Sequence, residues 1–150
     1  MLRSLATELI AEAGIVIGAT ASSTEEAVAQ CGKLLVELGA VSQEYADAMW
    51  EREQIFPSAI GAGFAIPHGT DQSRQYVIKD QLVFLQLAQP LAWGDEEVRC
   101  VLGIASKGDA HVELLGQLAE LLQEPENLQL FYSSNSKEAI LKLLASSAQL

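Results

Sequence analysis

Basic residues are scarce in this chain of 150 residues, which has 9 Lys and Arg against 20 Asp and Glu and a formal charge of −11. Proteins that bind nucleic acid neutralise its phosphates with a basic face, so this balance argues against a nucleic-acid partner. An anionic membrane surface would repel the chain for the same reason. No apolar run approaches the ~18 residues needed to cross a bilayer. We therefore expect neither nucleic-acid binding nor membrane insertion.

Cysteine is also rare, because Cys31 and Cys100 are the only two and they form no CxxC motif. A disulfide framework or a zinc site needs more ligands, so two buried thiols in a reduced protein are the simplest interpretation. The apolar residues after Met1 could imitate a secretory signal, but Glu8 and Glu12 interrupt them. The expected location is the cytoplasm, and we expect no metal.

Apolar residues, by contrast, make up 49% of the chain, enough for a packed core in one domain over residues 1–150. Helices at both ends with strands between them predict an α/β fold, a central mixed sheet with helices on both sides. Apolar spacing and turn residues predict helices at 23–38, 42–54, 110–123, after Pro125 and from Ser136, and strands at 15–17, 64–66, 82–87 and 98–105. The expected N-terminal caps are Ser23, Ser42, Asp109 and Ser136.

The chain has two histidines, and His68 lies in the segment Ile66-Pro67-His68-Gly69. Pro67 predicts that the strand ends here in a type I turn, with His68 in the bridge region where active-site residues often lie. His68 is therefore a candidate nucleophile or acid–base group, and the alternative is a surface histidine without function. A metal site lacks a second ligand at a recognisable spacing, and a Ser-His-Asp hydrolase lacks its nucleophile motif.

His111 and Arg52 are the other candidates. His111 falls in the first turn of a predicted helix, where backbone N–H groups favour a nearby phosphoryl group; the alternative is a helix-start histidine that bonds only to its neighbours. Arg52 stands between Glu51 and Glu53, so a solvated surface charge is its default interpretation. If the fold brought Arg52 beside His68, its guanidinium would bind phosphoryl oxygens through two N–H groups.

The segment over residues 53–69, EQIFPSAIGAGFAIPHG, resembles the active-site signature of the mannitol/fructose-type IIA domains of the bacterial phosphoenolpyruvate-dependent sugar phosphotransferase system. Residues 45–53, 101–105 and 110–112 match the family's order and spacing, and the resemblance runs from about Glu8 to Leu144. The stretches 66–70 and 102–105 are most similar to the mannitol branch. Phe64 departs from the signature, which usually has a smaller aliphatic residue, and we expect it to affect packing beneath the site.

This resemblance implies a cytoplasmic phosphocarrier, a phosphotransferase with a mixed five-stranded sheet covered by helices on both sides. His68 would accept a phosphoryl group on Nε2 from the histidine phosphocarrier HPr and pass it to a cysteine of a IIB domain. His111 would correspond to the family's second active-site histidine, and Arg52 to an arginine beside it. Neither a metal nor another cofactor is implied, and no GxxxxGK[ST] nucleotide loop occurs in the chain.

Two physical expectations accompany the resemblance. Attack on phosphorus needs a neutral imidazole, and an Nδ1–H bond to a backbone carbonyl would leave the lone pair on Nε2. Acidic residues around an apolar rim, with Phe64, Ile66 and Trp93 as candidates, would steer a basic patch of HPr toward His68.

Two other functions stay open. Nitrogen-related IIA proteins share the signature, and their phosphorylation state controls partner proteins instead of feeding a transporter. A passive ligand-binding α/β domain would require that neither histidine accept phosphate.

Overall fold

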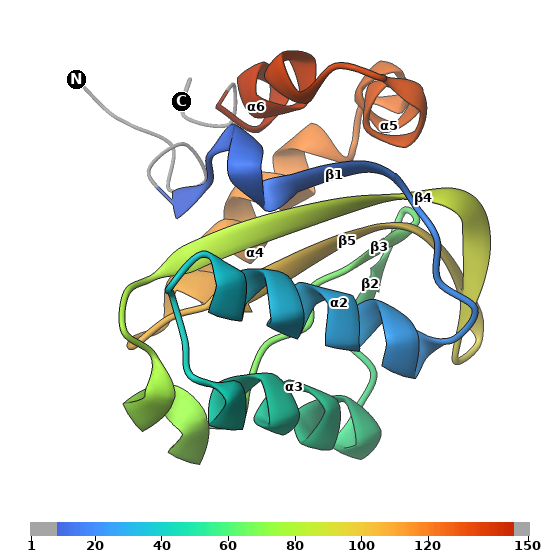
Figure 1. The fold of residues 1–150 in the computed structure, drawn as a ribbon. Helices are drawn as coiled ribbons and strands as arrows, with labels where there is room; N and C mark the ends of the chain where they lie inside the picture. The colour runs from blue at the N-terminus through green and yellow to red at the C-terminus, as the bar shows by residue number, and fades with distance from the viewer. Residues whose placement is uncertain (1–8, 146–150) are drawn as a thin grey trace.

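A mixed five-stranded sheet, with strand order β1-β4-β5-β3-β2, forms the centre of the molecule (Figure 1). The computed structural model describes residues 9–145, except the side chains of Ala110 and His111. The pairs β1/β4 and β3/β5 are parallel, whereas β4/β5 and β2/β3 are antiparallel, so the predicted mixed sheet is confirmed. The strands are β1 (Ile15–Ala19), β2 (Ala59–Gly61), β3 (Phe64–Ala65), β4 (Gln81–Trp93) and β5 (Glu96–Ala105).

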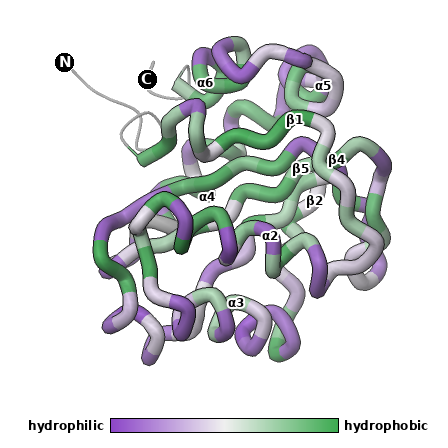
Figure 2. The backbone as a smooth tube through the Cα atoms, in the orientation of Figure 1, coloured by the Kyte–Doolittle hydropathy of each residue, from purple (hydrophilic) through white to green (hydrophobic). Residues whose placement is uncertain are grey.

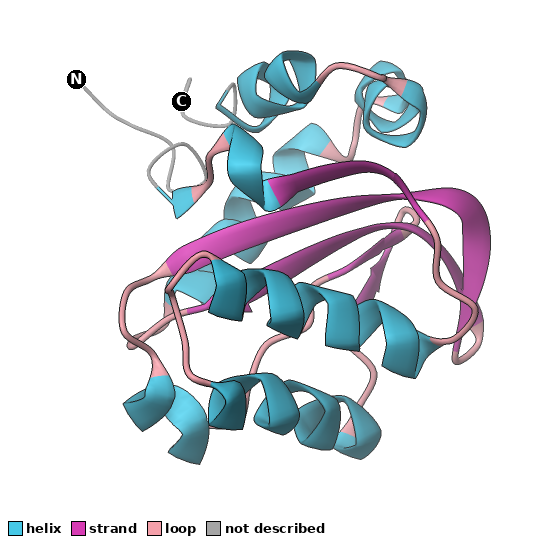
Figure 3. Cartoon of the chain, viewed as in Figure 1, coloured by secondary structure: helices cyan, strands magenta, loops and turns pink. Residues whose placement is uncertain are grey.

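Helices cover both faces of this sheet (Figures 1 and 3). One face carries α2 (Thr24–Glu37) with α3 (Gln43–Ile55) packed beside it, and the other carries α4 (Ala110–Leu121), α5 (Pro125–Ser133) and α6 (Lys137–Ala145). Two 3₁₀ helices, η1 (Glu12–Gly14) and η2 (Gln72–Tyr76), complete the order. The predicted helices are thus confirmed within a few residues at their ends. None of the helices in the described range is long and apolar enough to span a membrane.

The core lies in two layers, one on each side of the sheet. Successive residues of β4 alternate between them, because side chains of a strand point to opposite faces. Val83 and Leu85 pack toward α2, whereas Leu82 and Phe84 pack toward α4 and α5. The central strands are therefore apolar on both faces, which Figure 2 shows as green strands.

The β4–β5 hairpin is longer than the apolar runs predicted. β4 continues through Pro90 to Trp93, and its register against β5 shifts between Gln86 and Leu91. A proline is tolerated at such an irregularity, where no ladder hydrogen bond is needed. The extension carries Trp93 back onto the core beside α3, where its side chain is buried.

Two of the four predicted side-chain caps are present. The Oγ of Ser23 accepts from the Glu26 N–H at 3.1 Å, and the Oγ of Ser136 accepts from the Ala139 N–H at 3.1 Å. Ser42 and Asp109 occupy the predicted N-cap positions of α3 and α4, but neither side chain makes a cap hydrogen bond. The Ser42 hydroxyl makes no cap bond, and the Asp109 carboxylate accepts instead from Arg74 at 3.0 Å.

Phe64 anchors the layer beneath β3. Its ring is fully buried and meets the Phe131 ring edge-on, with the centroids 5.1 Å apart, while Phe84 lies 6.3 Å away. The departure from the family signature at this position thus fills a three-ring aromatic cluster.

We predict that Phe64→Ala lowers the free energy of unfolding by about 3–5 kcal/mol, because truncation leaves a cavity among rings that cannot close it. Urea denaturation followed by tryptophan fluorescence measures the loss. Phe56→Ala is the matched control: this ring is 68% exposed, and its removal should change stability by no more than about 0.5 kcal/mol. Equal losses in the two variants would contradict the packing described here.

Candidate functional site

His68 lies just beyond β3, at the carboxyl ends of the parallel strands β3 and β5. It forms a parallel bridge with Ile104, whose N–H donates to the Pro67 carbonyl at 2.9 Å. The predicted type I turn is therefore wrong, because pairing with β5 keeps this segment extended. The carboxyl ends of parallel strands are where α/β folds place their ligands.

The His68 imidazole is oriented by its own backbone. Nδ1 lies 2.9 Å from the Ile66 carbonyl oxygen, which can only accept a hydrogen bond. Nδ1 therefore carries a proton, and in the neutral ring the lone pair belongs to Nε2. This confirms the expected carbonyl partner, and the half-buried ring lines a pocket at the end of the sheet.

Tyr45 clamps the segment that follows His68. Its hydroxyl accepts from the Gly69 N–H at 2.9 Å and donates to the Ile104 carbonyl at 2.7 Å. Burial raises the pKa of Tyr45 to about 12, so the hydroxyl keeps its proton at neutral pH. A Cβ on residue 69 would stand 2.7 Å from the Tyr45 ring, so this close approach requires glycine.

Tyr45 is buried in α3, and its hydroxyl bonds to the Gly69 and Ile104 backbone were not predicted from the sequence. No local signal distinguishes a core tyrosine whose hydroxyl bridges two distant segments from one that simply packs.

The pocket next to His68 has a volume of about 230 Å³ and gathers residues from several elements. Arg52 of α3 and His68 both line it, so the fold brings together two of the three predicted site residues. Its other lining residues are Tyr45, Ile55, Gly69, Thr70, Asp71, Gln72, Arg74, Ile104, Ser106 and Gly108.

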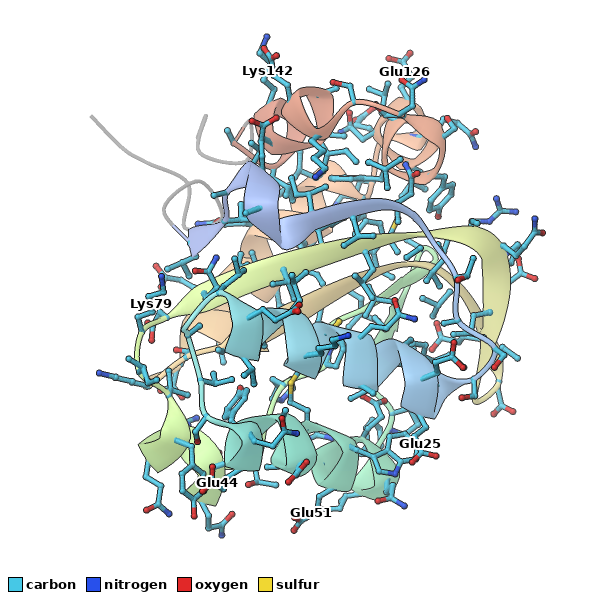
Figure 4. The ribbon with its side chains drawn as sticks, viewed as in Figure 1. Glu25, Glu44, Glu51, Lys79, Glu126 and Lys142 are labelled. Carbon is cyan, nitrogen blue, oxygen red and sulfur yellow. The ribbon has the colours of Figure 1, made fainter. Side chains whose placement is uncertain are left out.

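Arg52 is oriented by the end of its own helix. Its Nη1 donates to the Phe56 carbonyl at 2.7 Å, and no carboxylate in the described part of the chain lies within 4 Å of it. Glu51 points into solvent (Figure 4), and Glu53 turns into the core. Neither neighbouring glutamate therefore neutralises Arg52, and its partly exposed side chain lines the same pocket as His68.

Glu53 forms a buried brace behind the pocket. Its carboxylate accepts from the Ser58 N–H at 2.6 Å, from the Ser58 hydroxyl at 2.7 Å and from the Trp93 indole at 2.9 Å. These bonds tie the end of α3, which carries Arg52, to the β4–β5 hairpin. Sequence reasoning did not identify this role, because glutamate in an amphipathic helix usually faces water.

His111 is the second residue of α4, and its side chain lies outside the described residues. The segment that leads into this helix does reach the site, because Ser106 and Gly108 line the pocket. Arg74, which the sequence analysis also missed, lines the pocket and pairs with Asp109 at the start of α4.

The predicted apolar rim is wrong. Phe64, Ile66 and Trp93 are all buried in the core. Among the exposed apolar side chains, Ile55 lines the pocket and is 73% exposed, and Phe56, 68% exposed, follows it in sequence. Both follow Arg52 in sequence, Ile55 as the last residue of α3 and Phe56 as its C-cap.

The remaining candidate chemistry does not reach the pocket. Cys31 and Cys100 are buried free thiols, as predicted, and burial raises the pKa of Cys31 to about 12, so it stays protonated and unreactive. Among the described residues, no three histidines, cysteines or carboxylates cluster closely enough to hold a metal.

We predict that Tyr45→Phe destabilises the protein by about 1–3 kcal/mol, because it leaves the Gly69 N–H and the Ile104 carbonyl without their partner. Urea denaturation at pH 7 measures the change. Tyr76→Phe, in a partly exposed ring, is the control and should have no effect.

Alkaline pH provides a second readout. The folded pKa of Tyr45 is raised from its usual 10.0 to about 12, so its contribution to stability is complete below pH 10 and is lost as the pH rises toward 12. Wild type should lose more stability over this interval than Tyr45→Phe. Identical pH profiles would contradict the burial of the Tyr45 hydroxyl.

Sequence comparison identifies relatives along nearly the whole chain. Residues 8–147 match the family model described as "Phosphoenolpyruvate-dependent sugar phosphotransferase system, EIIA 2". The mannitol-specific phosphotransferase enzyme IIA component of Staphylococcus aureus is 38% identical over 134 residues, covering 89% of this chain and 93% of that protein. The mannitol-specific EIICBA component of Vibrio cholerae is 35% identical over 134 residues, which cover 87% of this chain and 21% of that protein.

Solved structures agree with these matches. IIA mannitol from Escherichia coli has a TM-score of 0.85 at 32% identity, covering 91% of this chain and 99% of that one. The enzyme IIAMTL in a complex with phosphorylated enzyme IIBMTL has a TM-score of 0.86 at 31% identity, covering 91% and 97%. The nitrogen regulatory protein IIA-Ntr of Neisseria meningitidis, with a TM-score of 0.80 at 21% identity over 94% and 99%, shares the fold. With a family model matched over residues 8–147 and two mannitol IIA structures similar over 91% of its length, this chain belongs to the EIIA 2 family of the phosphoenolpyruvate-dependent sugar phosphotransferase system.

Proposed function

We propose that this protein is the IIA phosphocarrier of a mannitol-type phosphotransferase system, which accepts a phosphoryl group from phospho-HPr on His68 and passes it to a IIB domain. The observation that carries the proposal is the Nδ1 bond of His68 to the Ile66 carbonyl, which assigns the lone pair to Nε2 in a pocket shared with Arg52. Nucleophile and cation are thus prepared in one place.

The transfer needs no other reactant. The Nε2 lone pair forms a bond to phosphorus while the bond between phosphorus and the donor's histidine nitrogen breaks, and its electron pair returns to the donor ring. The His68 proton stays on Nδ1, so the phosphorylated ring becomes cationic. That charge strengthens its hydrogen bond to the Ile66 carbonyl and stabilises the phosphorylated form.

The second transfer reverses these changes. The thiolate of a IIB cysteine attacks phosphorus, the N–P bond breaks, and the electron pair returns to Nε2, which restores the neutral imidazole. Arg52 neutralises the phosphoryl oxygens in both steps, and His111, carried by the first turn of α4, is the proposed second histidine of the site. No metal or cofactor takes part in the proposed sequence.

The similar proteins favour transport over nitrogen-type regulation. The Vibrio cholerae relative joins a IIA region to IIB and IIC regions in one mannitol-specific chain, and the Escherichia coli structure holds IIA against phosphorylated IIB. The match to IIA-Ntr, at 21% identity, extends to the fold alone. We further propose a cytoplasmic location, which the two buried, unpaired cysteines support.

We predict that phosphoenolpyruvate, enzyme I and HPr together add one phosphoryl group that is labile in acid and stable in base. His68→Ala should abolish the labelling, because the nucleophilic nitrogen is lost. His111→Gln should retain the attachment site but slow transfer or alter the lifetime of the phosphorylated form. Intact-mass spectrometry and ³²P labelling measure both. Labelling lost in His111→Gln and retained in His68→Ala would reverse the assignment.

Adding a purified mannitol-type IIB domain to the labelled protein separates the two functions. Rapid movement of the label to the IIB cysteine supports transport. A label that stays on His68 while the protein binds another target supports regulation.

Steering of HPr by acidic residues yields a separate prediction. Three exposed acids of α3, Glu44, Asp47 and Glu51, line a groove that adjoins the pocket through Thr70 and Gln72. Figure 4 shows Glu44 and Glu51 on the side of the molecule opposite Glu126. Such a one-signed surface accelerates encounters with a basic partner.

We expect higher ionic strength to slow transfer from phospho-HPr, and neutralising these three acids (Glu44→Gln, Asp47→Asn, Glu51→Gln) to remove most of that salt dependence. The matched control neutralises three exposed acids between the end of α4 and the start of α5, Glu120, Glu124 and Glu126. Stopped-flow or quench-flow kinetics give the second-order rate constant. A rate that salt leaves unchanged in wild type would remove the steering hypothesis.

A further inference from the structure

We propose that Arg74 is a second phosphoryl-binding residue of the pocket, held by Asp71 and Asp109 until a phosphoryl group replaces them. The inference rests on the proposed function of His68 and extends it. The sequence analysis did not single out Arg74, and its placement emerges only from the fold.

Arg74 reaches the pocket from a separate element that packs against α3. It belongs to η2, whose start is tied down by the Ser73 N–H bond to the Thr70 Oγ1 at 3.2 Å, and both Thr70 and Arg74 line the pocket. Burial raises the pKa of the Tyr45 hydroxyl, and the positive charge of Arg74 partly offsets that rise. The guanidinium therefore lies near the hydroxyl that holds the Gly69 N–H, one residue after His68.

The guanidinium of Arg74 has donors to spare. Its Nη2 is 3.0 Å from the Asp109 carboxylate and 3.4 Å from that of Asp71, and these are its only hydrogen-bond or ion-pair partners in the described part of the chain. An arginine has five N–H donors, so Nη1 and Nε remain available to a ligand. Arg52 is arranged alike, with Nη1 on the Phe56 carbonyl and its other nitrogens available.

The ion pairs that Arg74 forms with Asp71 and Asp109 are weak. The side chains of Asp71 and Asp109 are 89% and 74% exposed, whereas that of Arg74 is 34% exposed. Exposed ion pairs contribute little, because water solvates the separated carboxylates almost as well. A phosphoryl dianion in the pocket offers two negative charges and three oxygens, so it competes favourably for the arginine.

The charges around the pocket favour the exchange of the two aspartates for a phosphoryl group at Arg74. Asp71 lines the pocket, and the chain as a whole carries a net charge of −11, so both repel an incoming phosphoryl group. If Arg74 did not contact that group, Arg52 would be the only arginine of the pocket to offset this repulsion. A second arginine from a different element would contact the group from another side. In the empty pocket, the two aspartates would also limit repulsion between the two guanidinium groups.

The test compares Arg74→Gln and Arg74→Lys with Arg99→Gln. Arg99 is the matched control because it is also a partly exposed arginine beside a carboxylate, Glu97 at 4.0 Å, and it does not line the pocket. We expect Arg74→Gln to lower kcat/KM for phosphoryl transfer from phospho-HPr by about 10- to 100-fold, the loss typical of a charged hydrogen bond. Arg74→Lys should fall between Arg74→Gln and wild type, since lysine keeps the charge without the planar donors.

Titration of the ³¹P resonance of phosphorylated His68 gives a readout that a purely structural role would not change. Loss of a cation beside the phosphoryl group should raise its apparent pKa in Arg74→Gln and leave it unchanged in Arg99→Gln. Asp109→Asn breaks the same ion pair but keeps the arginine, so transfer should equal or exceed the wild-type rate. If Asp109→Asn instead reproduced the defect of Arg74→Gln, Arg74 would only brace α4, and the inference would be overturned.

The outcomes also separate this inference from the proposed function. A wild-type protein that phospho-HPr does not label at His68 would remove the proposed function. Normal labelling of wild type, with Arg74→Gln indistinguishable from Arg99→Gln in rate and ³¹P titration, would remove only the role of Arg74.

Discussion

The pairing of the His68 segment with the end of β5 is the constraint on which the site depends. The Ile104 N–H holds the Pro67 carbonyl, the Ile104 carbonyl holds the Tyr45 hydroxyl, and that hydroxyl holds the Gly69 N–H. Backbone is thus fixed on both sides of His68, and the Ile66 carbonyl then fixes the ring. A side chain held in this way loses little conformational freedom when a partner protein arrives, which suits the proposed phosphoryl transfer because that reaction depends on in-line positioning.

An acidic protein that handles a phosphoryl group must separate its charges. Here the separation is made by burial and direction: Glu53 is turned into the core and satisfied by three donors, while Glu51 and Glu44 face solvent on α3 (Figure 4). The pocket itself keeps Arg52 and Arg74, with Asp71 as the one carboxylate among its lining residues. The same chain can therefore present an acidic outer face to a basic partner and a cationic interior to phosphate.

Local signals in the sequence succeeded where a short segment determines its own structure. The Ser23 cap and the Pro125 start of α5 are both observed, because each depends on residues a few positions apart. Local signals failed where a segment distant in sequence binds the same backbone or side-chain groups. The turn at His68 is replaced by a bridge to β5, the Asp109 carboxylate is taken by Arg74, and the residues expected in the rim are covered by helices from elsewhere in the chain.

The amino-acid sequence alone determined the class of fold, the family resemblance and the choice of His68 and Arg52, because these are written in apolar periodicity and in a short signature of unusual residues. Only the tertiary structure decided that neither flanking glutamate pairs with Arg52, that Tyr45 and Arg74 line the pocket, and that Ile55 is the exposed apolar residue there instead of the expected rim. The orientation of a side chain and the choice of its charged partner depend on how separate elements pack together. The packing energy comes from residues that are far apart in the chain, so the sequence of one local segment does not predict it.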